Sequence, residues 1–311
     1  MLNTELRPLG AGEMLDRAVT LYVRWFPQIV LVLAVVSVPV ILLQALVAPQ
    51  AAHVWSDMAQ VFGSTGSAAS RRAGEAMAAD SRFTPLTFVV MFGAGVVRVL
   101  MWSAILAVVA AAYGGVRTSL ADAYRLALKR WFPQIVVGLT FLILGGIASI
   151  PVFAIYFVFA AAMVALSVMQ QTVAVVVVAV IAFLVVVAAL GVIVSFVFMA
   201  YELAAVAVVT ETGNPLEAVQ ISLRRSFARG MKRRTVVAGL VLMLLSYAGT
   251  LPIVGIAIVA TMLTHVDALY FAIIGAGTVL LDGMVAAYAV VYAVDVRVRR
   301  EGYDLLLAPT A

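Results

Sequence analysis

Cysteine is absent from this chain of 311 residues, and histidine occurs only twice, as His53 and His265. The lack of cysteine excludes disulfides and thiolate metal sites, and the two histidines have no spacing typical of metal ligands. Charge is scarce as well, because Asp, Glu, Lys and Arg make up 11% of the residues against about 25% in an average soluble domain. We therefore expect no metal site and no cofactor, and the composition argues against a soluble domain.

Hydrophobic residues make up 65% of the chain, more than a single core of this size can hide from water. A transmembrane helix needs about 20 consecutive apolar residues. The segments that meet this requirement are residues 28–47, 86–113, 134–169, 172–209, 235–263 and 269–294. They are uniformly apolar rather than alternating, which favours helices over strands. The sequence predicts an all-α integral membrane protein with six spans, and an eight-span alternative splits the third and fourth segments.

The basic residues indicate the orientation of these spans. Sixteen of the 20 lysines and arginines lie before the first span, between spans two and three, between spans four and five, or after span six. By the positive-inside rule both termini are then cytoplasmic. We expect a multi-pass protein of the bacterial cell (inner) membrane. Its formal charge of +5 then reflects membrane topology, and we expect no nucleic-acid partner.

An internal repeat precedes the spans. The heptapeptide "RWFPQIV" occurs at residues 24–30 and again at 130–136, each time after an amphipathic segment, and "NPLEAVQISLRRSF" is a looser third version. We predict three repeats, at 9–113, 117–209 and 214–300, each an interfacial amphipathic helix followed by a helix pair. Proline disfavours helical geometry at the residue before it. Pro27 and Pro133 are therefore expected to break the helix where the chain enters the bilayer.

The predicted interfacial helices carry the candidates for lipid head-group contact. These are Arg17, Arg24, Trp25, Arg125, Lys129, Arg130, Trp131, Arg224 and Arg225. Aromatic residues gather at the depth of the head groups, and basic clusters attract anionic lipids. The helices serve either to anchor the spans or to form a cytoplasmic collar that binds anionic lipids or a protein partner.

Three stretches resemble a known family: "LRPLGAGEMLDRAVTLYVRWF", "VTETGNPLEAVQISLRRSFARG" and "VDVRVRREGYDLLL". On these the chain is similar to the bacterial multi-pass membrane domain of glycerophosphoryl diester phosphodiesterases. The activity in that family's name belongs to a separate soluble barrel, for which this sequence has no candidate domain. The resemblance therefore implies a membrane architecture and not the catalytic activity.

Ionisable residues within the predicted spans mark a possible site. Arg98 and Asp282 lie near the middle of spans two and six, and Glu202 lies in span four nearer its cytoplasmic end. A charge at the bilayer centre costs about 2.5 to 3.5 kcal/mol. We predict a direct Arg98–Asp282 pair, with Glu202 as the alternative partner of Arg98. The pair either fixes helix packing or lines a polar cavity for a substrate or proton.

Glycines beside these charges are expected to let helices approach closely. They are Gly93 and Gly95 in span two and Gly275, Gly277 and Gly283 in span six.

Catalytic motifs are missing from the sequence: there is no zinc-protease helix motif, no phosphate-binding glycine loop and no serine elbow. We therefore predict that the protein is not an enzyme but a scaffold or subunit of a membrane complex. Its expected partners are the lipid bilayer and a protein in the membrane or at the cytoplasmic face. The alternative is a transporter or lipid-handling protein that uses the polar site at Arg98, Asp282 and Glu202.

Overall fold

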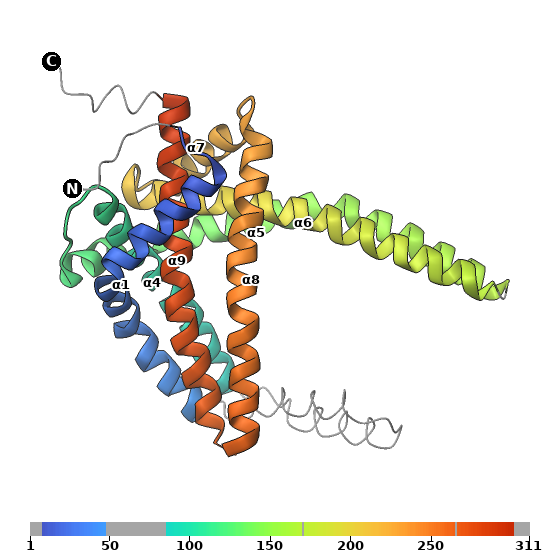
Figure 1. Cartoon of the computed structure of the whole chain (residues 1–311), viewed down its shortest axis with the longest axis horizontal. Helices are drawn as coiled ribbons and strands as arrows, with labels where there is room; N and C mark the ends of the chain where they lie inside the picture. Colours follow the sequence, from blue (N-terminus) through green and yellow to red (C-terminus); the bar gives the residue numbers. More distant parts are fainter. Residues whose placement is uncertain (1–7, 48–84, 170, 265, 302–311) are drawn as a thin grey trace. The chain divides into compact units, whose positions relative to one another are not determined.

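The computed structural model describes residues 8–47, 85–169, 171–264 and 266–301 (Figure 1). These residues form helices and short connections, with no strand among them. The helices are α1 (Ala11–Val47), α4 (Pro85–Tyr113), α5 (Leu120–Val168), α6 (Thr172–Thr210), α7 (Pro215–Phe227), α8 (Met231–Thr264) and α9 (Asp267–Glu301). The predicted all-α fold is therefore confirmed. His53 and His265 lie outside the described residues.

Six of these helices are long and apolar enough to cross a membrane, and α7 is the exception. In the described part of the chain the span count therefore follows the six-span prediction. The segments that the eight-span alternative would split are single helices, α5 of 49 residues and α6 of 39. The chain is a polytopic membrane protein.

The two copies of "RWFPQIV" do not break the chain as predicted. Helix α1 continues through Pro27, and α5 continues through Pro133. A proline removes one backbone hydrogen bond and crowds the carbonyl four residues earlier, so the helix can bend and still continue. Figure 1 shows such a change of direction along α1. The predicted separate amphipathic helix is thus wrong for the first two repeats.

The third repeat does have a helix of its own, α7. The side chain of Asn214 accepts a hydrogen bond of 3.0 Å from the backbone N–H of Leu216, and Pro215 is the first helical residue. Asparagine at the N-cap followed by proline is a strong helix start, because the cap accepts an otherwise free N–H and proline needs no partner there. The boundaries of the three repeats themselves stay a prediction.

The described chain packs as two units. The first comprises residues 15–47, 85–131, 244–264 and 266–288, and the second comprises residues 8–14, 132–169, 171–243 and 289–301. Within the first unit, glycines let α9 approach its neighbours. A Cβ placed on Gly275, Gly277 or Gly283 would lie within 2.7 Å of an isoleucine on α1 or α8. The packing role is wrong for Gly93 and Gly95, because a Cβ there would meet open space.

The second unit has a core where α5, α6 and α7 meet. Its buried members are Val137, Phe141, Ala200, Ala204, Ala207, Val208, Ala218 and Val219. The alanines on α6 are small, which lets α7 lie close along that helix. Helices α6 and α8 also touch at Gly239, where a Cβ would lie 2.0 Å from the carbonyl oxygen of Ser195. Only a residue without a side chain fits this crossing.

Candidate functional site

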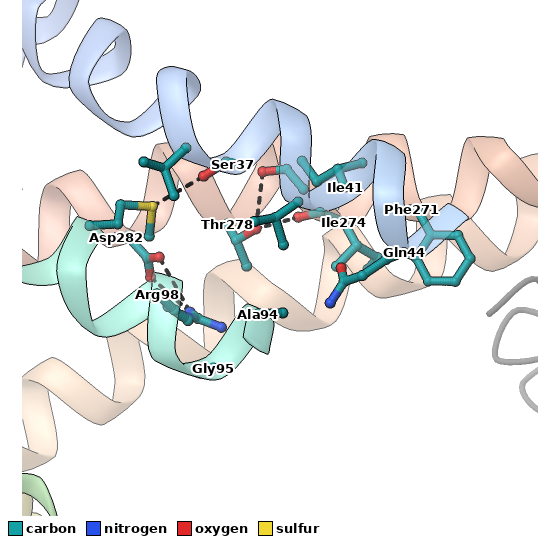
Figure 2. Close-up of a pocket in the computed structure, with 14 residues that line it drawn as sticks. Ser37, Ile41, Gln44, Ala94, Gly95, Arg98, Phe271, Ile274, Thr278 and Asp282 are labelled. Atoms are coloured by element: carbon teal, nitrogen blue, oxygen red, sulfur yellow. Dashed lines mark hydrogen bonds and ion pairs between the residues drawn. The ribbon is translucent and has the colours of Figure 1, made fainter. Parts of the chain in front are cut away.

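The predicted ion pair between spans two and six is present in the first unit. Nη2 of Arg98, on α4, lies 3.3 Å from both carboxylate oxygens of Asp282, on α9 (Figure 2). The pair forms because both residues lie at similar positions along their helices, and because a lone charge is costly there. The direct contact expected from the sequence is therefore confirmed.

The two partners differ in exposure. The side chain of Arg98 is 62% exposed, whereas that of Asp282 is 15% exposed. A guanidinium carries N–H donors on each of its nitrogens. Only Nη2 of Arg98 is engaged, and its other nitrogens have no partner among the described residues. The carboxylate thus holds the arginine in place, and the rest of the guanidinium is available to a further acceptor.

A cavity of about 270 Å³ lies beside this pair, among α1, α4 and α9 (Figure 2). Its polar lining residues are Ser37, Gln44, Arg98, Thr278 and Asp282. The rest of the lining is mainly apolar and includes Val36, Val40, Ile41, Phe271 and Ile274. The combination of one ion pair with mainly apolar lining residues suits an amphiphile with a small polar head.

The backbone of α4 and α9 creates this space. Gly95 lies one turn before Arg98 and lines the cavity, where its missing side chain leaves room. Gly275 brings α1 close to α9, since a Cβ there would lie 2.0 Å from Cδ1 of Ile41. Thr278 turns its hydroxyl back to the carbonyl oxygen of Ile274 at 2.7 Å. The polar groups that line the cavity for a ligand are therefore the charged pair and the amide of Gln44.

Glu202 does not belong to this cavity. It lies on α6 in the second unit, where its side chain is buried. Asp282 already neutralises Arg98, so the alternative pairing of Arg98 with Glu202 is not required. The sequence placed the three ionisable residues in one candidate site, but the lining of the cavity contains only Arg98 and Asp282.

The predicted head-group candidates divide by exposure. Exposed are Arg24, Arg125, Lys129, Trp131 and Arg224, and half-buried are Arg17, Trp25 and Arg130. Arg17 donates a hydrogen bond of 3.2 Å to the hydroxyl of Tyr113, and Arg125 lies 3.5 Å from Asp122. These residues remain candidates for lipid contact.

Arg225 is the exception, because it is buried and fully engaged. Its Nη1 and Nη2 donate to the two oxygens of Glu211 at 2.7 and 2.8 Å, and its Nε donates to Glu301 at 2.8 Å. Burial by itself lowers the pKa of Arg225, but hydrogen bonds and attraction from Glu211 and Glu301 outweigh it and raise the pKa. Arg225 therefore joins the ends of α6, α7 and α9, and its predicted head-group role is wrong.

A second ionic network, missed in the sequence, surrounds Asp295 on α9. Its carboxylate accepts from the backbone N–H of Leu9 at 2.7 Å, and it lies 2.9 Å from Arg234 and 3.0 Å from Arg299. The carbonyl oxygen of Leu9 accepts from the same two arginines. The available signal was a carboxylate at the end of an apolar run, four residues before an arginine on the same helix face.

These two networks use the stretches that carry the family resemblance. Leu9 lies in the first stretch, Glu211 and Arg225 lie in the second, and Asp295 lies in the third. Comparisons with protein families, with characterised proteins and with solved structures find no match to this chain.

Proposed function

We propose that the protein binds an amphiphilic molecule with an anionic head in the cavity beside Arg98 and Asp282, and that it handles such a lipid or solute within the membrane. The observation that carries this proposal is the largely exposed Arg98 guanidinium, which is anchored through a single nitrogen at the wall of a cavity. An ion pair that served packing alone would engage more of its donors and enclose both partners.

The chemistry of the pair favours an acidic head group. The planar guanidinium matches carboxylate and phosphate oxygens, which it binds through paired N–H donors. Asp282 competes for the same guanidinium, so a bound anion is released again instead of being held permanently. The apolar lining residues of α1 and α9 then accommodate the hydrocarbon part of the ligand.

The predicted orientation of the spans indicates on which side of the membrane the cavity opens. The lining residues are 36–44 on α1, 94–101 on α4 and 271–282 on α9. If both termini are cytoplasmic, each of these segments lies in the middle or the outer half of its span. The ligand is therefore expected to enter from the non-cytoplasmic leaflet of the membrane.

The test uses oleate as the anionic amphiphile and oleyl alcohol as its uncharged match, each titrated into delipidated protein in a neutral detergent. Arg98→Gln should weaken oleate binding by about tenfold or more, because a charge-assisted hydrogen bond is lost. Arg300→Gln removes an exposed arginine on α9 outside the cavity, and it should leave oleate binding unchanged.

Asp282→Asn should change the affinity for oleate in the direction opposite to Arg98→Gln. It releases Arg98 from its competitor, so oleate should bind more tightly than to the unaltered protein. Equal affinity of all variants for oleate, or equal binding of oleate and oleyl alcohol, would refute the proposal.

The scaffold or subunit role predicted from the sequence stays a separate prediction. It requires a stoichiometric partner protein that remains bound in several mild detergents. The family resemblance likewise supports only a shared membrane architecture within this proposal.

A further inference from the structure

A second cavity of about 560 Å³ lies in the first unit, at the first copy of the repeated heptapeptide. One wall is α1, and the other is the connection from α4 to α5. Gly115 permits the turn in this connection with a φ of 77°, which favours glycine. Nε2 of Gln28 donates to the carbonyl oxygen of Thr118, and this bond ties the connection to α1. The cavity is thus built by a fixed contact between segments 90 residues apart.

Helix packing next to the cavity holds this contact in place. The hydroxyl of Tyr124, in the second turn of α5, donates a hydrogen bond of 2.6 Å to the carbonyl oxygen of Val32 on α1. Tyr124 and Gln28 therefore fasten the beginning of α5 to α1 at two points. The cavity therefore lies beside a junction of α5 and α1 that two hydrogen bonds hold.

The charge in this cavity is positive. Arg24 and Arg117 line it, and neither has a carboxylate partner among the described residues. This sets them apart from Arg98, Arg225 and Arg234, which all pair with a carboxylate. Two unpaired arginines at one cavity repel each other unless an anion lies between them. The cavity therefore has the electrostatics of an anion site.

Further donors point to the same chemistry. Nε1 of Trp25, another lining residue, is buried without a hydrogen-bond partner in the described part of the chain. Ser119 caps α5 by accepting from the backbone N–H of Asp122 at 3.1 Å, so the positive end of the α5 dipole begins at the cavity. The carboxylate of Asp122 would repel an anion in this cavity, but it already accepts hydrogen bonds from the hydroxyl of Ser119 and from Arg125.

We propose that this cavity binds the phosphate group of an anionic phospholipid. The apolar surroundings favour a lipid over a soluble phosphate, because Val23, Phe26 and Val116 are all exposed near the lining residues. These side chains can lie among acyl chains while Arg24 and Arg117 hold the phosphate. The site shares no residue with the cavity at Arg98, so this proposal can be tested independently of the proposed function.

The test compares dioleoyl phosphatidylglycerol with dioleoyl phosphatidylcholine, each added to delipidated protein and measured by native mass spectrometry. Arg24→Gln combined with Arg117→Gln should weaken phosphatidylglycerol binding by about thirtyfold, as expected for the loss of two charges at a head group. Binding of phosphatidylcholine should change less, because its head group has no net charge. The matched control is Arg233→Gln, which removes an exposed arginine outside the cavity and should leave binding unchanged.

Two further variants protect the test against loss of folding. Arg24→Lys with Arg117→Lys keeps both charges and should restore most of the affinity. Trp25→Phe removes the indole N–H together with part of the aromatic ring system and should weaken phosphatidylglycerol binding. The same loss of affinity in Arg233→Gln as in the double glutamine variant would mean unspecific attraction and would overturn the proposal. Displacement of phosphatidylglycerol by millimolar sodium phosphate would assign the cavity to free phosphate and overturn the choice of a lipid.

Discussion

Replacing Asp295 by alanine should destabilise the protein strongly. Its side chain is 0% exposed, and it accepts from the backbone of Leu9 and from two arginines. Removing one partner of a buried ion pair typically costs about 3 to 5 kcal/mol. In the alanine variant Arg234 and Arg299 keep the carbonyl oxygen of Leu9 as a partner, and both side chains are partly exposed. We therefore expect the free energy of unfolding to fall by about 3 kcal/mol, the lower end of that range.

The substitution Asp295→Asn removes the charge at this position but keeps the size and shape of the side chain. Asp295→Asn keeps an acceptor oxygen for the N–H of Leu9 but loses the charge that the arginines contact. A hydrogen bond to a charged group contributes about 1.5 to 3 kcal/mol, and the asparagine variant should lose stability within that range. Asp295→Ala should therefore be the less stable of the two.

The free energy of unfolding can be measured by equilibrium titration with SDS, followed by circular dichroism. Asp122→Ala is the matched control, because it removes a carboxylate that is 62% exposed and lies 3.5 Å from an exposed arginine. Exposed pairs contribute about 1 kcal/mol or less. If Asp295→Ala and Asp122→Ala lost the same stability, the network at Leu9 would not be a stabilising contact and the reasoning would be refuted.

Three further predictions concern a helix crossing, the ion pair and a buried amide. Gly239→Ala should lower the free energy of unfolding by about 3 kcal/mol, because its Cβ would lie 2.0 Å from a backbone oxygen of α6. Gly255→Ala is the control on the same helix: its Cβ meets open space, and the same titration should show no loss of stability. Arg98→Ala and Asp282→Ala should each lower the free energy of unfolding, and the double variant should lose less than the sum of the two single losses. The expected coupling is about 1 kcal/mol, as for polar contacts between membrane helices, and additive losses would exclude it. Gln134→Leu should raise the midpoint of thermal unfolding, because its buried amide has no hydrogen-bond partner among the described residues, and an unchanged or lower midpoint would contradict this.

The sequence by itself determined the fold class and the candidate pair. Long apolar runs leave helices in a membrane as the stable solution, since each helix satisfies its own backbone hydrogen bonds in lipid. The cost of a lone charge in hydrocarbon likewise made Arg98 and Asp282 natural partners once both fell at similar depth. These conclusions need only local composition and residue spacing.

The tertiary structure decided which predicted features persist. A proline can break a helix or only bend it, and in the folded chain α1 continues through Pro27 and α5 through Pro133. Arg225 looked like one more basic residue on an amphipathic helix, yet carboxylates from the ends of two other helices turn it inward. A helical pattern shows which residues share a face, but it does not show what that face meets.

The contacts between distant segments were also beyond the sequence. Leu9 and Asp295 are 286 residues apart, and nothing local to either predicts that a backbone amide and a carboxylate meet. The cavity at Arg24 likewise needs the turn at Gly115 to bring Arg117 beside α1. Residue identity fixed the charge and hydrogen-bonding capacity of each group. Only the folded chain decided which groups satisfy one another and which remain free for a ligand, because that depends on distances that sequence spacing does not set.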